Sequence, residues 1–155
     1  MSNVLIKDLK DVLSCMNKHC MKENKDVDKQ IPLIQTKIKP LYVKMTDIRT
    51  RYESKKISEA EYKKLTDKVL KDIRAISDKF EMTPVILKRN TCTATKCQPE
   101  TMRQFKTLDK LYTDSCKKNK KMCTIAKTTK TLAKQQKISG NDLSKFRMLE
   151  LKSER

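Results

Sequence analysis

Apolar residues recur at steps of three and four along most of the chain, the spacing that places side chains on one face of an α-helix. Over residues 2–27 this repeat predicts one amphipathic N-terminal helix, marked by Leu5, Leu9, Val12, Met16 and Cys20. A longer repeat covers residues 31–52, where the steps of three and four alternate without interruption, as in a heptad seam. Its members are Ile31, Ile34, Ile38, Leu41, Met45, Ile48 and Tyr52. Pro40 interrupts this pattern, and we expect it to kink or split the helix because proline removes a backbone hydrogen bond.

A third helix is predicted to begin at Ser58, since Ser58 and Glu61 have the spacing of a capping box. Its apolar stripe consists of Tyr62, Leu65, Val69, Ile73, Ile76 and Phe80. Two helices of similar length joined by a short link favour an antiparallel hairpin, which we place at residues 28–82.

The remainder of the chain divides into two parts. Residues 83–98 contain Val85-Ile86-Leu87 and a run of threonines, and β-branched residues favour an extended or irregular segment, so we expect a loop. Pro99 and Glu100 resemble a helix start. We expect one long helix or two abutting helices from there to Ser139, a break at residues 139–141, and a short final helix from Asp142 to Glu150. Residues 99–155 therefore form a helical C-terminal region.

These elements predict an all-α fold: a helical bundle built on an antiparallel heptad-type hairpin, with one irregular loop, in a single domain over residues 1–155.

Composition excludes several other classes of protein. With Gly140 as the only glycine, a glycine-rich phosphate loop cannot form. With His19 as the only histidine, a metal site with two histidines cannot form. The aliphatic runs are too short to span a bilayer, and the first ten residues do not resemble a signal peptide.

The charge is strongly positive and unevenly distributed. The chain has 37 Lys and Arg against 19 Asp and Glu, a formal net charge of +18. Residues 83–137 hold 14 basic and 3 acidic groups, which makes the C-terminal region the basic part of the molecule. Only 7 of the cations are arginine. Lysine acts as a hydrated point charge, whereas reading bases favours the arginine fork, so a sequence-specific nucleic-acid reader is not expected.

On a helix, the lysines of the basic region would form a broad cationic face that binds anions, on nucleic-acid phosphates or on an acidic protein surface. Phe105 and Tyr112 fall on the apolar stripe, so stacking platforms for bases are missing from this face. The candidate partner-binding residues are Lys88, Arg89, Lys96, Lys117, Lys118, Lys120, Lys121, Lys127 and Lys130.

The six cysteines fall into three pairs, Cys15/Cys20, Cys92/Cys97 and Cys116/Cys123. Three states compete: free buried thiols, structural disulfides, and a zinc site built from the last four. A helix separates residues five or seven apart by about 7.5 or 10.5 Å, whereas a disulfide needs Cα atoms within about 6.8 Å. The first and third pairs therefore cannot close internally if they are helical. Bonds would instead join the first helix or the 92–97 loop to the late basic helix, and the pairing stays open.

No motif indicates catalysis, and we expect no enzyme, no cofactor, no metal and no small-molecule substrate. The leading hypothesis is a structural or assembly protein that contacts acidic neighbours in a large complex through its lysine face and through Val85-Ile86-Leu87. The alternative is a basic, non-sequence-specific nucleic-acid-binding or packaging protein that uses the lysines at 117–121.

A small chain that is rich in lysine and threonine and poor in glycine, with paired cysteines and no secretory signal, resembles minor structural proteins of large nucleocytoplasmic DNA viruses. The resemblance implies a minor capsid or virion-internal role, and a location in the virion or the cytoplasm. Such viruses typically encode their own thiol oxidation route, which would be compatible with disulfides in a cytoplasmic setting. No residue role follows from the resemblance.

Overall fold

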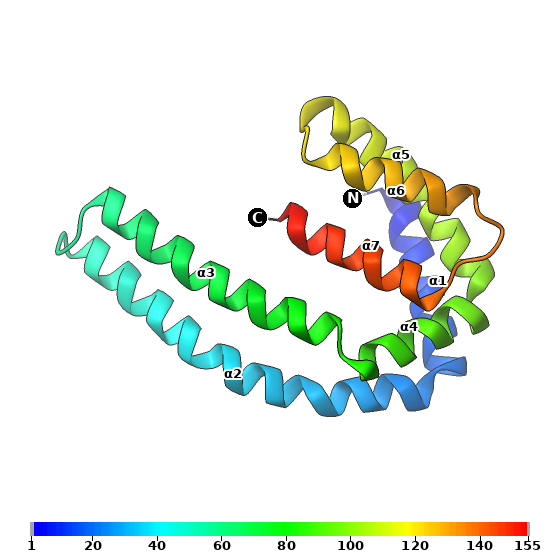
Figure 1. Ribbon diagram of the computed structural model, residues 1–155, viewed down its shortest axis with the longest axis horizontal. Helices are drawn as coiled ribbons and strands as arrows, with labels where there is room; N and C mark the ends of the chain where they lie inside the picture. Colours follow the sequence, from blue (N-terminus) through cyan, green and yellow to red (C-terminus); the bar gives the residue numbers. More distant parts are fainter. Residues whose placement is uncertain (1, 155) are drawn as a thin grey trace. The chain divides into compact units, whose positions relative to one another are not determined.

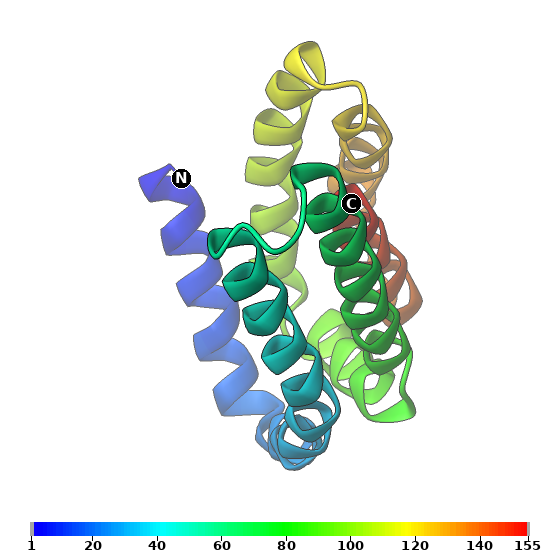
Figure 2. The same cartoon turned by 90° about the vertical axis from the view of Figure 1, so that its left-hand side faces the viewer.

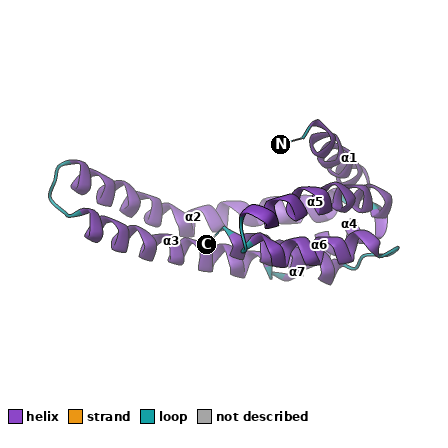
Figure 3. Ribbon diagram, turned by 90° about the horizontal axis from the view of Figure 1, so that it is seen from above, coloured by secondary structure: helices purple, strands orange, loops and turns teal. Residues whose placement is uncertain are grey.

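The computed structural model describes residues 2–154, and every regular element within them is a helix (Figure 3). The elements are α1 (Asn3–His19), α2 (Met21–Glu53), α3 (Glu59–Glu81), α4 (Pro84–Lys96), α5 (Gln98–Lys118), α6 (Met122–Lys134) and α7 (Gly140–Ser153). The all-α prediction is confirmed. The described residues form two compact units, one from 2–27 with 81–154 and the other from 28–80, and each is described by itself.

The second unit is the hairpin that the heptad seam predicts. The parts of α2 and α3 that belong to it run side by side in opposite directions (Figure 1). Ile48, Ile57 and Val69 are its buried core, and the rings of Tyr52 and Tyr62 stack with centroids 4.5 Å apart. Ser58 accepts a hydrogen bond from the Glu61 backbone at 3.2 Å, as the capping pattern predicts. Of the two outcomes expected at Pro40, a kink or a split, the split does not occur, because α2 continues through both of its prolines.

The first unit packs α1, α4, α5, α6 and α7 around one apolar core. The core contains Leu5, Phe105, Leu108, Ile125, Leu132, Ile138 and Phe146. The rings of Phe105 and Phe146 meet edge to face at 5.0 Å, which locks α5 against α7. Figure 2 shows α5 and α6 as an antiparallel pair joined by a turn at the end of this unit. The expected run from residue 99 to 139 is therefore broken at residues 119–121 into two helices that fold back on each other.

Residues 83–98 are the clearest error of the sequence-based interpretation, because they form helix α4 and not a loop. Pro84 occupies the first turn, and the buried positions Ile86, Asn90, Thr93 and Ala94 share one face. The threonines fit the helix since their hydroxyls donate to the carbonyl four residues earlier, for example Thr93 to Arg89 at 2.9 Å. Packing on this face outweighs the weak β preference. Ile86 is 1% exposed, so it is not the partner-facing apolar residue that we expected.

The predicted N-terminal helix over 2–27 is also too long. α1 ends at His19, and Cys20 adopts a non-helical backbone conformation with φ −123° and ψ 32°. Cys97, between α4 and α5, has nearly the same conformation, φ −119° and ψ 33°. Both side chains are fully buried. The α1–α2 and α4–α5 junctions are therefore built in the same way: a buried cysteine ends one helix directly before the next helix begins.

Candidate functional site

All six cysteines of the described chain are in disulfides. Of the three states that the sequence left open, free thiols, disulfides and a zinc site, the structure therefore has the disulfides. Cys15 pairs with Cys97, and Cys20 pairs with Cys92, with Cα separations of 5.9 and 6.0 Å. These two bonds join α1 and its junction with α2 to α4 and its junction with α5. The expectation that disulfides would join these segments to the late basic helix is wrong. The segment 92–97, expected to be irregular, belongs to α4 and its C-terminal end, and α4 packs beside α1.

The third bond joins Cys116 to Cys123, with Cα atoms 4.6 Å apart. The conclusion that this pair cannot close is wrong, since it assumed a continuous helix and α5 ends at Lys118. We call residues 116–123, Cys-Lys-Lys-Asn-Lys-Lys-Met-Cys, the lysine loop. Asn119 shapes it: its backbone N–H donates to Ser115 at 2.9 Å, and its side chain accepts from the Lys121 backbone at 3.0 Å.

The lysine loop presents four cations on a short, covalently closed turn. Lys117, Lys118, Lys120 and Lys121 are all exposed. Lys117 forms one ion pair, 3.6 Å from Asp114, and both side chains are 75% exposed, so the pair holds that lysine only weakly. Lys127 and Lys130 are exposed on α6 and extend the charge along the hairpin. The α5–α6 hairpin therefore carries a basic surface of the first unit.

The other predicted members of the cationic face lie elsewhere. Lys88 and Lys96 are exposed on α4, at the opposite end of the first unit from the lysine loop (Figures 1 and 2). Arg89 is half-buried and lines a cavity beneath α4. The nine residues therefore do not form one broad face, because three of them lie on α4 and six on the lysine loop and α6.

Two groups of side chains have the composition of a metal site: Cys15, Cys97 and Glu100, and Cys20, Cys92 and Glu23. In both groups the two sulfurs are bonded to each other. A metal ligand sulfur must be a thiolate, so these groups do not offer one in the oxidised protein. The zinc alternative from Cys92, Cys97, Cys116 and Cys123 is excluded in the same way, because these cysteines belong to three different disulfides.

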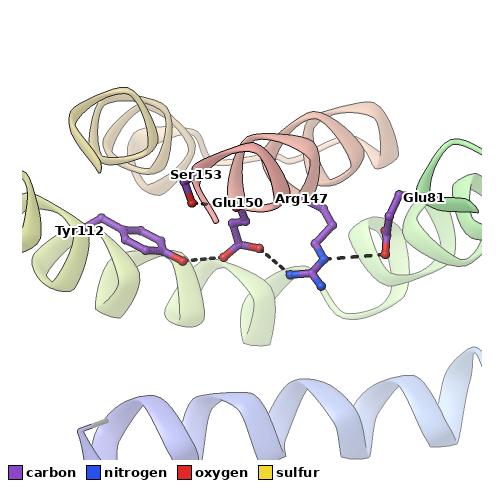
Figure 4. Close-up of polar contacts among 5 residues, drawn as sticks. All are labelled: Glu81, Tyr112, Arg147, Glu150 and Ser153. Atoms are coloured by element: carbon purple, nitrogen blue, oxygen red, sulfur yellow. Dashed lines mark hydrogen bonds and ion pairs between the residues drawn. The ribbon is translucent and has the colours of Figure 1, made fainter. Parts of the chain in front are cut away.

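A polar network that the sequence analysis missed lies between α5 and α7 (Figure 4). The Tyr112 hydroxyl donates to Glu150 at 2.5 Å. Arg147 donates to the other oxygen of Glu150 at 3.3 Å, and its Nε lies 3.8 Å from Glu81. The i, i+3 spacing of Arg147 and Glu150 was the available signal. It could not point to Tyr112 or Glu81, which tertiary packing brings to the same place.

Tyr112 supplies a pH-dependence prediction. Burial, and then the hydrogen bond to Glu150, raise the pKa of Tyr112 above its ordinary value of 10.0. Because the folded pKa is the higher one, this tyrosine stabilises the fold fully below pH 10, and the contribution is lost as the pH rises towards the folded pKa. We expect wild-type stability to fall more steeply above pH 10 than that of Tyr112→Phe. Urea unfolding of both proteins at alkaline pH measures this, and equal slopes would contradict it.

Comparison with known proteins finds no relative, since no family model, no curated protein and no solved structure matches the chain. Within residues 2–154, none of the helices combines the length and the apolar character needed to cross a membrane.

Proposed function

We propose that this chain is a non-catalytic structural or assembly protein that attaches to acidic surfaces of neighbouring proteins through its α5–α6 hairpin. The lysine loop is the observation that carries the proposal. Four exposed lysines stand on an eight-residue turn closed by the Cys116–Cys123 disulfide. Such a turn has little backbone freedom to lose on binding, so the cations are presented at low entropic cost.

The chemistry of the loop favours a broad acidic partner. Lysine ammonium groups attract carboxylates from any direction, whereas planar bidentate recognition requires arginine. Arg103 is the one arginine on the hairpin, and it lies on α5 far in sequence from the loop. Following the resemblance to viral minor structural proteins, the larger complex would be a virion or its cytoplasmic precursor.

A second candidate is a basic nucleic-acid-binding or packaging protein. It is favoured by the same charge, because non-specific phosphate binding needs only cation density. The two candidates differ in what they predict for the partner: a carboxylate polymer for the assembly protein and a phosphate polymer for the packaging protein.

A salt titration of binding to poly-glutamate and to random duplex DNA tests the proposal. We expect saturable binding to poly-glutamate that is tighter than binding to DNA, for which a dissociation constant of about 10⁻⁴–10⁻⁶ M is ordinary for any basic protein. Reversing Lys117, Lys118, Lys120 and Lys121 to Glu should weaken poly-glutamate binding by at least about tenfold.

The matched control reverses Lys63, Lys64, Lys68 and Lys71, which are exposed on α3. This variant has the same net charge as the loop variant but an intact lysine loop, and it should bind nearly as wild type does. Equal losses in the two variants would mean that only net charge matters, which contradicts the proposal. Submicromolar DNA binding, with a log–log salt slope that the loop variant reduces by about 4, would favour the packaging protein instead.

A further inference from the structure

The first unit contains a cavity of about 600 Å³ that the proposed function does not use. Residues of α1, α4, α5 and α7 line it. The close neighbours of α7 are α4 and α6, while those of α1 are α4 and α5, so α1 and α7 flank the cavity without packing on each other. A volume of this size is typical of sites for small organic ligands, at about 300–1,000 Å³.

Most of the cavity wall is apolar and firmly held. Leu5, Phe105, Leu108 and Phe146 are each less than 8% exposed, so they belong to the folded core and form the floor of the cavity, with little surface that a ligand can reach. Met16 and Leu143 are partly buried and offer more of their side chains to the cavity. Leu9 is partly buried on α1 and completes this wall. Such a surface fits the hydrocarbon part of a ligand.

The polar network of Figure 4 forms the other part of the lining. The charges of the whole lining balance, since it contains Arg89 and Arg147 as well as Glu81 and Glu150. Arg147 engages the two carboxylates through its Nε and Nη1 atoms, which leaves Nη2 of the guanidinium to donate to a ligand oxygen. A negatively charged head group there would meet two carboxylates, and a positively charged one would meet two guanidinium groups.

We propose that this cavity binds an uncharged amphiphile, a molecule with a hydrocarbon body and one hydroxyl or carbonyl oxygen. The body lies against Leu9, Met16 and Leu143, and the oxygen accepts a hydrogen bond from Arg147. This inference does not use the lysine loop, which begins at Cys116, after the last α5 residue of the cavity lining, Tyr112.

The test uses the uncharged fluorescent probe N-phenyl-1-naphthylamine on the oxidised full-length protein. We expect saturable binding at one site per chain. Dodecanol should displace the probe more effectively than dodecanoate or dodecylamine, which share its chain and differ in the charge of the head group. Absence of saturable binding would overturn the proposal, and so would better displacement by dodecanoate.

Two tryptophan variants locate the site. Leu9→Trp fills the cavity and should weaken probe binding by at least about tenfold, while Leu13→Trp adds the same ring one turn later, at a position that is 56% exposed and outside the lining. The control should bind as wild type does. Equal binding by both variants would show that the probe sits elsewhere on the surface and would overturn the assignment.

Arg147→Met tests the polar end, and it decides the matter if Leu9→Trp does not fold. The Arg147 side chain is 47% exposed, so its loss should leave the fold intact. Removing it leaves Glu81 and Glu150 in excess over Arg89. The affinity of dodecylamine relative to dodecanol, measured by displacement of the probe, should then rise by about tenfold. An unchanged preference would mean that the head group does not reach Arg147, and the proposed orientation would be wrong.

Discussion

Removing both inter-helix disulfides is expected to destabilise the first unit by about 7 kcal/mol, whereas removing either one alone costs about 3 kcal/mol. The reason is geometric. The first bond formed closes a loop of 72 or 82 residues in the unfolded chain, which is worth about 4–5 kcal/mol of chain entropy. Once it is formed, the second bond closes only a ring made from residues 15–20 and 92–97, worth about 3 kcal/mol. The loss of both bonds is therefore larger than the sum of the two single losses, because each remaining bond still closes the long loop.

The variants are Cys15→Ala with Cys97→Ala, Cys20→Ala with Cys92→Ala, and all four together. Hydrogen exchange at buried amides of the first unit, such as those of Phe105 and Ile125, gives the free energy of opening for each. Removing Cys116 and Cys123 serves as the control, because that bond closes a separate loop and its effect should add to the others. A fourfold variant whose loss equals the sum of the two pairs would contradict the shared-loop argument.

The second large effect is expected at Gly140. The backbone there does not need glycine for its dihedral angles, since the described chain has no glycine with positive φ. The constraint is the close approach of α7 to α4: a Cβ on Gly140 would lie 2.8 Å from both the Cα and the N of Thr91. A backbone cannot turn aside as a side chain can, so the two helices would have to separate.

Gly140→Ala should therefore lower the free energy of unfolding by about 3 kcal/mol, at the upper end of the usual cost of overpacking. Separation would also weaken the buried hydrogen bond from Asn90 to Ser144, which is 3.0 Å long and joins the same two helices. Asn141→Ala, at the next and exposed position, is the control and should change stability by less than about 0.5 kcal/mol. Urea unfolding measures both, and equal effects would rule out the close-approach explanation.

The α2–α3 hairpin was predictable because its information is local and repeated. The seam from Ile31 to Tyr52 and the stripe from Tyr62 to Phe80 each repeat over several turns, and Ser58 marks a helix start. α7 was predictable in the same way: Ser139 caps it and forms a capping box with Asp142. Local spacing is enough wherever one helix face carries the whole signal.

The first unit was predictable only in part, because its decisive features join distant residues. Nothing local overrides the β preference of Thr91, Thr93 and Thr95, whereas the buried face of α4 does so in the folded chain. The disulfide pairing had one usable signal. Cys15 and Cys20 have the same spacing as Cys92 and Cys97, and each pair is followed by a glutamate three residues on, at Glu23 and Glu100. Two equal spacings fit an antiparallel pairing of 15 with 97 and 20 with 92.

Only part of the candidate site could be predicted from the sequence. The lysines at 117–121 were identified from charge alone, but their presentation on a closed turn depends on where α5 ends. The cavity could not be predicted, because Leu5, Phe105 and Phe146 have the pattern of ordinary core residues. Only tertiary packing brings α1, α4, α5 and α7 around one space.

Residue-resolved acetylation of lysines, in the free protein and in its poly-glutamate complex, tests the central claim most directly. The lysine loop is proposed as the contact surface, so Lys117, Lys118, Lys120 and Lys121 should react much more slowly in the complex. Lys63, Lys64 and Lys68 on α3 are also exposed in the free protein and should react at the same rate in both states. Protection spread evenly over all lysines, or strongest on α3, would contradict the assignment of the α5–α6 hairpin as the partner-binding surface.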